Sequence, residues 1–269
     1  MPEKVFPGIW QSLALVFAVL ALDILVLLLL KRWGLMDAGG GMVAETAGIV
    51  VSNGLVTAVF LARRGLTLRN VLHPNPASAR AVTGLLAVPV LLVSPAIFLA
   101  SSIVDDLLEL AYPMSDWYRR MFEEMLGGGA ATVVALLFVG PFFEELLFRG
   151  IVLRGLLARM PAGRAIVISS LIFGAAHLNV YQFVGAGLLG LPLGWLYARF
   201  RSIWPCMLLH AAQNLQVLLS VLWLGKDAQS TDVPPLVWAV AALACVPAAR
   251  FMRALLSTAD AASRQEPSA

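Results

Sequence analysis

The sequence predicts an all-α polytopic membrane protein with about eight transmembrane helices, and three observations carry this prediction. Of its 269 residues, 60% are hydrophobic and only 13% are charged, whereas a soluble domain is nearer half apolar and a quarter charged. Apolar runs recur along the whole chain at about the 20 residues that a bilayer core requires. Lys and Arg concentrate in alternate loops between these runs. An excess of apolar residues needs an apolar solvent, so we expect the chain to lie in a membrane.

Eight runs are apolar enough to be interpreted as helices in the membrane. They cover residues 9–30, 43–62, 82–104, 130–157, 165–178, 183–200, 204–224 and 235–256. The fifth run is short and the fourth is long for a single span. No soluble domain, low-complexity tract or clear repeat separates them, so we expect one transmembrane domain over residues 1–269.

The loop at 105–129 has a different pattern. Its apolar residues recur at helical spacing, with charged residues on the other face. The apolar set is Trp117, Tyr118, Met121, Phe122 and Met125. We expect an amphipathic helix on the membrane surface, which serves either as a connector or as a gate.

The basic residues predict the orientation. With eight spans the two termini share a side, and of the 19 Lys and Arg residues all but five lie on that side. The five exceptions are Lys31, Arg32, Arg119, Arg120 and Lys226. The positive-inside rule then predicts cytoplasmic termini. Because the positive charge sits in short loops between spans, we expect membrane lipid as a partner and no nucleic acid. The Ala-, Leu- and Arg-rich composition favours a bacterial inner membrane.

Two adjacent carboxylates, Glu144 and Glu145, stand in the fourth run shortly after Pro141. Glu145 and Arg149 are four residues apart, so they share a helix face and can form an ion pair. Glu144 lies about 100° around the helix from Glu145. Burial increases the proton affinity of a carboxylate, which suits a general base. A structural ion pair would explain Glu145 and Arg149, but it does not explain Glu144.

Further polar residues occupy the fifth and seventh runs. His177 ends the fifth, and His210 and Asn214 are four apart on one face of the seventh. Counted from the nearest cytoplasmic arginines at about 1.5 Å per residue, these residues and Glu144 all lie roughly 14–20 Å deep. We therefore predict one polar site near the middle of the membrane.

The three patterns Glu-Glu-x-x-x-Arg, Phe-x-x-x-His and His-x-x-x-Asn, in this order, resemble the CPBP family of CAAX proteases and bacteriocin-processing enzymes. The resemblance covers about residues 130–220. It implies an eight-helix membrane endopeptidase in which Glu144 activates water and His177 assists it. His210 and Asn214 would stabilise the oxyanion, while Glu145 and Arg149 would hold these groups in place.

The cofactor question stays open between two possibilities. Two His and a Glu could bind zinc or another divalent ion, as in a metalloprotease, although the His-Glu-x-x-His pattern of zincins is absent. Asn is an unusual zinc ligand but a good oxyanion donor. A metal-free glutamate mechanism is therefore equally compatible with the sequence.

The first functional hypothesis is an intramembrane endopeptidase that cleaves a membrane-anchored or lipidated protein near its C-terminus. The alternative is a non-catalytic chaperone, immunity protein or scaffold with the same fold. A transporter fits less well, because the polar residues cluster in one half of the chain and no inverted repeat is visible.

Two smaller features also allow two interpretations each. Asp23 and Glu45 lie in the first two runs, where packing against a neighbouring helix or a position at a partly wet interface is favoured over a functional role. Ala186, Gly190 and Gly194 recur every four residues in the sixth run. This pattern favours close helix packing over a substrate gate.

Overall fold

A computed structural model describes residues 6–35, 41–127, 129–225 and 228–265, and this part of the chain is helical, with no strand. Its α-helices are α1 Ile9–Arg32, α2 Gly41–Arg64, α3 Leu68–Leu72, α4 Ala79–Ala111, α5 Asp116–Leu126, α6 Gly129–Val134, α7 Gly140–Glu145, α8 Arg154–Leu157, α9 Ala162–Ala175, α10 Val180–Phe200, α11 Trp204–Leu224 and α12 Pro235–Gln265. Two π-helical segments, η2 Ala135–Val139 and η3 Leu146–Leu153, join α6, α7 and α8 into one continuous rod. A short 3-10 helix, η4 Ser230–Asp232, precedes α12.

All eight predicted runs fall on helices, which confirms the polytopic all-α prediction. In the described part of the chain, seven helices are long and apolar enough to cross a membrane. The exception among the predicted runs is α9, which has 14 residues and is therefore about 21 Å long. A bilayer core is about 30 Å thick, so α9 is too short to cross it alone.

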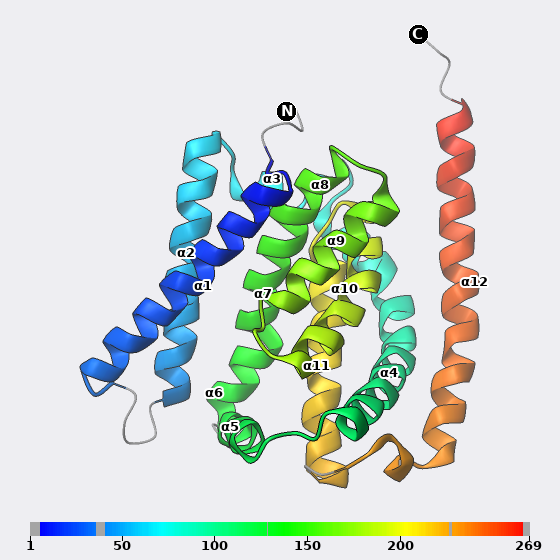
Figure 1. Cartoon of the computed structure of the whole chain (residues 1–269). Coiled ribbons are helices and arrows are strands. Elements are labelled where there is room, and N and C mark those ends of the chain that lie inside the picture. Colours follow the sequence, from blue (N-terminus) through cyan, green and yellow to red (C-terminus); the bar gives the residue numbers. More distant parts are fainter. Residues whose placement is uncertain (1–5, 36–40, 128, 226–227, 266–269) are drawn as a thin grey trace.

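The rod from α6 to α8 stands in the middle of the bundle (Figure 1). The α1–α2 hairpin forms one flank, and α2 contacts the rod at α6, η2 and α7. On the other side α4 packs against α10, α11 and α12, while α10 lies along α9. The best-buried side chains come from η3 and the helices around it, so the core of the molecule surrounds the Glu144–Arg149 segment.

Small residues explain why α9 and α10 approach each other so closely. A Cβ atom on Gly190 would lie 2.7 Å from Cβ of Ser170 and 2.9 Å from its Cα. One on Gly194 would lie 2.9 Å from Cγ2 of Ile166. No side chain larger than hydrogen fits there without a shift, which supports the packing interpretation of this pattern.

The amphipathic segment forms a helix, α5, which lies across one end of the bundle (Figure 1). Trp117 is exposed, whereas Tyr118 is buried and stacks on Tyr181 of α10 at a ring-centroid distance of 5.6 Å. The side chains of Met121, Phe122 and Met125 lie outside the described residues. The predicted apolar face is therefore described only at its first turn.

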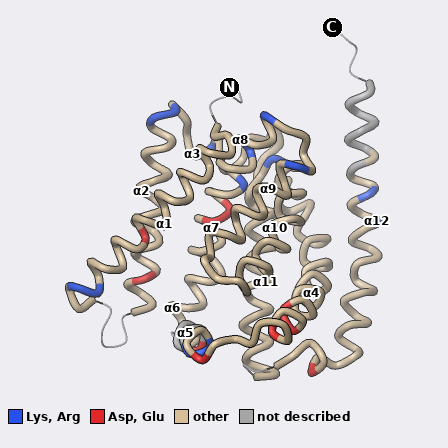
Figure 2. Tube along the Cα trace, in the orientation of Figure 1, with Lys and Arg blue, Asp and Glu red and all other residues tan. Residues whose placement is uncertain are grey.

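The two ends of the bundle differ in their charged residues, although Lys and Arg occur at both (Figure 2). The arginine-rich end carries the last turn of α2 and the α8–α9 connection, with Arg63, Arg64, Arg159 and Arg164. The opposite end, called the α5 end below, carries the acidic last turns of α4. The first described residues of α1 and the last of α12 lie toward the arginine-rich end (Figure 1).

Candidate active site

Glu145 and Arg149 form the buried centre of the site. Their side chains are 0% and 1% exposed, and Nη1 of Arg149 lies 2.9 Å from Oε1 of Glu145. Nδ1 of His210 lies 2.8 Å from the same oxygen. The Arg149 guanidinium also stacks over Phe173, with Cζ 4.5 Å from the ring centroid. A buried carboxylate needs such partners, so Glu145 is fixed by contacts from two other side chains.

Glu144 has different surroundings. Its side chain is 34% exposed, and its Oε2 lies 3.6 Å from Nε2 of His210. It borders a small cavity of about 170 Å³ together with Asp23 and His177. The two adjacent glutamates are therefore distinct: Glu145 is enclosed and paired, while Glu144 faces open space.

The His210 ring bridges the two carboxylates, with one nitrogen directed to each. An ionised carboxylate only accepts hydrogen bonds, so Nδ1 of His210 donates to Glu145. A neutral ring then has a lone pair at Nε2, and a protonated ring has an N–H there. His210 can thus take or give a proton at Nε2 beside Glu144.

His177 occupies the turn between α9 and α10 and not the fifth helix itself, where the sequence placed it. The chain reverses here through Leu178, whose φ of 58° is left-handed, and Asn179 caps the start of α10. Nδ1 of His177 lies 3.0 Å from the Phe173 carbonyl oxygen. Because a carbonyl only accepts, Nδ1 donates and Nε2 is available to other groups.

Asn214 is held by a backbone carbonyl that the π-helical segment leaves free. In η2 the N–H of Gly140 bonds to the Ala135 carbonyl, five residues back. The next carbonyl, that of Leu136, would take its bond from residue 141, but Pro141 has no N–H. The side chain of Asn214 donates to this carbonyl at 2.7 Å. Because Pro141 cannot donate to the Leu136 carbonyl, this oxygen is available to hold the side chain of Asn214.

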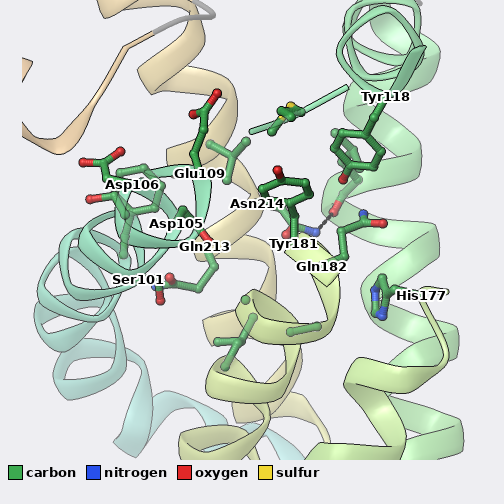
Figure 3. Close-up of a pocket in the computed structure, with 18 of the residues that line it drawn as sticks. Ser101, Asp105, Asp106, Glu109, Tyr118, His177, Tyr181, Gln182, Gln213 and Asn214 are labelled. Carbon is green, nitrogen blue, oxygen red and sulfur yellow. Dashed lines mark hydrogen bonds between the residues drawn. The ribbon is translucent and has the colours of Figure 1, made fainter. Parts of the chain in front are cut away.

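A large cavity of about 630 Å³ connects these groups with the α5 end of the bundle. His177, His210 and Asn214 line its inner part, with Phe173 and Leu136. Residues of α4, α5 and the start of α10 line its mouth, and Figure 3 shows their side chains around the space. His177 borders both the large and the small cavity.

The structure thus places all the predicted site residues around one centre. Glu144, Glu145 and Arg149 come from the central rod, His177 from the α9–α10 turn, and His210 and Asn214 from α11. Within the described residues, no group of three or more His, Cys, Asp or Glu side chains could hold a metal ion. This concerns the arrangement of side chains and leaves the choice between the two mechanisms open.

Two polar features near the site were not assigned to it from the sequence. Gln213, the neighbour of Asn214, donates to the carbonyl and the hydroxyl of Ser94 at 2.8 and 2.9 Å, and so ties α11 to α4. Asp23 accepts a hydrogen bond from Ser52 of α2, as the packing interpretation expected, but it also borders the small cavity beside Glu144. The polar character of both residues was visible in the sequence, while their neighbours were not.

The fold and this arrangement of Glu, His and Asn side chains define a helical membrane protein with a polar site buried among its helices. Residues 127–216 match the model of the type II CAAX prenyl endopeptidase Rce1-like family. This segment contains every predicted site residue, which confirms the resemblance seen in the motifs.

One curated relative comes from Bacillus subtilis (strain 168) and bears the name "Putative membrane peptidase YdiL". It is 33% identical over 81 residues, which are 30% of this chain and 33% of that protein. The match therefore spans about a third of the length of the relative. No solved structure matches the chain.

Proposed function

We propose that this chain is an intramembrane endopeptidase that cleaves membrane-anchored or lipidated proteins by means of a water molecule activated at Glu144. The observation that carries the proposal is the contrast between the two glutamates. Arg149 and His210 hold Glu145 in place, while Glu144 faces a cavity beside two histidines. A scaffold has no need for an incompletely enclosed carboxylate inside a membrane.

The proposed reaction begins when Glu144 takes a proton from water next to the scissile carbonyl. The hydroxide attacks the carbonyl carbon, and the negative charge develops on the carbonyl oxygen. Asn214 has a second N–H besides the one bonded to Leu136, and protonated His210 has one at Nε2, so both can donate to this oxyanion. The proton then passes from Glu144 to the leaving amine as the C–N bond breaks. His177, with Nε2 free, orients the water and shares its proton.

The match of the segment 127–216 to a CAAX endopeptidase family supports this class of reaction. It also supports a cleavage site near the C-terminus of the substrate. Both termini are proposed to be cytoplasmic, since the arginine-rich end carries the first residues of α1 and the last of α12.

The test compares membrane proteins in cells that express the wild-type chain or Glu144→Gln. We expect a set of membrane proteins to be shortened near their C-terminus with the wild type only, as read by mass spectrometry of terminal peptides. Glu144→Gln preserves shape and removes the base, so the protein should accumulate normally. Identical substrate lengths in both strains would favour the non-catalytic alternative.

A further inference from the structure

The mouth of the large cavity is acidic. Among the described residues, five with full charges line the cavity, and all five belong to the last turns of α4 or to α5. Four are carboxylates, Asp105, Asp106, Glu109 and Glu123, and the fifth is Arg119. Arg119 pairs with Glu109 at 3.1 Å. Among the described residues of the mouth, carboxylates therefore outnumber basic groups, whereas the whole chain has a net charge of +3.

The carboxylate of Asp105 lies across the mouth of the cavity. It is exposed and projects from α4 toward Gly185 of α10. Among the described residues it has no hydrogen-bond or ion-pair partner. The carboxylate of Asp106 accepts one hydrogen bond, from the backbone N–H of Ser230 at 2.8 Å. Within the described part of the chain, Asp105 and Asp106 thus have no basic partner.

Tyr118 provides an independent observation. Its side chain is only 9% exposed, held by the stack on Tyr181. Its hydroxyl has no hydrogen-bond partner in the described part of the chain, and it points into the cavity (Figure 3). The polar group of a side chain that is buried to this extent normally finds a partner. An aromatic ring beside carboxylates is also a common environment for a cationic group.

We propose that this acidic mouth, formed by Asp105, Asp106 and Tyr118, binds a positively charged segment of the substrate polypeptide. The proposal rests on the proposed function and names the substrate class: a membrane-anchored protein with Lys or Arg close to the scissile bond. A cleft lined by one sign of charge concentrates ligands of the other sign. The bound Lys or Arg would orient the adjacent peptide bond toward His177, His210 and Asn214 at the inner end.

The test measures binding without turnover. The full chain carrying Glu144→Gln is placed in phosphatidylcholine nanodiscs with EDTA, so that no divalent ion can bridge the carboxylates. Three palmitoylated peptides serve as probes, identical except for a Lys-Lys, Gln-Gln or Glu-Glu pair. We expect the Lys-Lys peptide to bind about tenfold more tightly than the Gln-Gln peptide at low salt, and less so at high salt.

Three variants locate the effect. Asp105→Asn combined with Asp106→Asn should remove the preference for Lys-Lys, and Asp105→Lys should favour Glu-Glu instead. Asp116→Asn is the matched control, because Asp116 is exposed on the same end but does not line the cavity. Thermal unfolding shows whether each variant is folded. Equal binding of the three peptides, or a preference that survives in the double variant, would overturn the proposal.

The two proposals fail separately. A Lys-Lys preference in a protein that shortens no membrane protein in cells would leave the acidic mouth established and the peptidase function refuted. Shortened substrates without any charge preference would leave the peptidase function established and the acidic mouth refuted.

Discussion

The different surroundings of Glu144 and Glu145 support the separate roles that we propose for these two chemically identical side chains. Glu145 compensates the only fully buried guanidinium of the described residues, that of Arg149. Glu144 keeps an open side toward the small cavity. The two variants to glutamine should therefore differ in stability as well as in activity.

Glu145→Gln should lower both stability and activity. It leaves Arg149 buried without its charge partner, which costs about 3 kcal/mol or more of unfolding free energy. Glu144→Gln is the matched control, and it should lose turnover with little change in stability. Thermal unfolding in detergent and cleavage of an identified substrate measure the two quantities. The reverse pattern would mean that the roles of the two glutamates are exchanged.

Residue spacing predicted some of these contacts and could not predict others. The Glu145–Arg149 pair follows from the four-residue helical repeat. The contact between His210 and Glu145 joins residues 65 positions apart. The position of Asp23 depends on how the α1–α2 hairpin packs. Such neighbours are set by tertiary packing, which no local pattern encodes.

In the central rod, Pro141 is expected to control the position of Asn214, the candidate oxyanion donor. Pro141→Ala supplies an N–H that can bond to the Leu136 carbonyl, in competition with Asn214. We expect unchanged or higher thermal stability and at least a tenfold lower turnover. Phe142→Ala is a control in the same turn that leaves the backbone donors as they are. Undiminished turnover in Pro141→Ala would show that the free carbonyl does not position Asn214 for catalysis.

The contact between α9 and α10 allows a second test. Gly190→Ala places a methyl group against the backbone and side chain of Ser170, so it should lower stability by about 1–3 kcal/mol. Gly187→Ala lies on the same helix with its nearest neighbour, the Ser170 carbonyl oxygen, at 3.8 Å. It should have little effect on the unfolding midpoint. A stable Gly190→Ala variant that rejects only bulky substrates would revive the gate interpretation.

The sequence predicted where the helices lie better than it predicted which of them are π-helical. Apolar runs located every long helix, because the length of a span follows from bilayer thickness. The π-helical segments on both sides of Glu144 and Glu145 were not predicted, since a change of pitch leaves no apolar periodicity of its own. The end of α9 before His177 was missed because Ala175 and Ala176 continue the apolar run.

The two ends of the bundle are expected to face opposite sides of the membrane, and cysteine labelling can check this. Arg69 in α3 and Ser230 in η4 lie toward opposite ends. Single cysteines at these positions, in a chain with Cys206 and Cys245 replaced by alanine, should react with an impermeant reagent from opposite sides of the membrane. We expect Arg69→Cys to be protected in intact cells and Ser230→Cys to be labelled. Labelling of both from one side would refute the predicted topology.

The position of His177 between two cavities has a kinetic consequence. Peptide hydrolysis inside a membrane needs a polypeptide and a water molecule, and water is scarce there. If both had to share one cavity, a bulky polypeptide would displace the water that the reaction requires. Here the polypeptide has room in the 630 Å³ space, while the separate 170 Å³ space beside Glu144 and Asp23 can store several water molecules. In the proposed reaction, the polypeptide and the water would reach His177 from different cavities and would not compete for the same space. Turnover should therefore reach a plateau at saturating polypeptide concentrations and not decline.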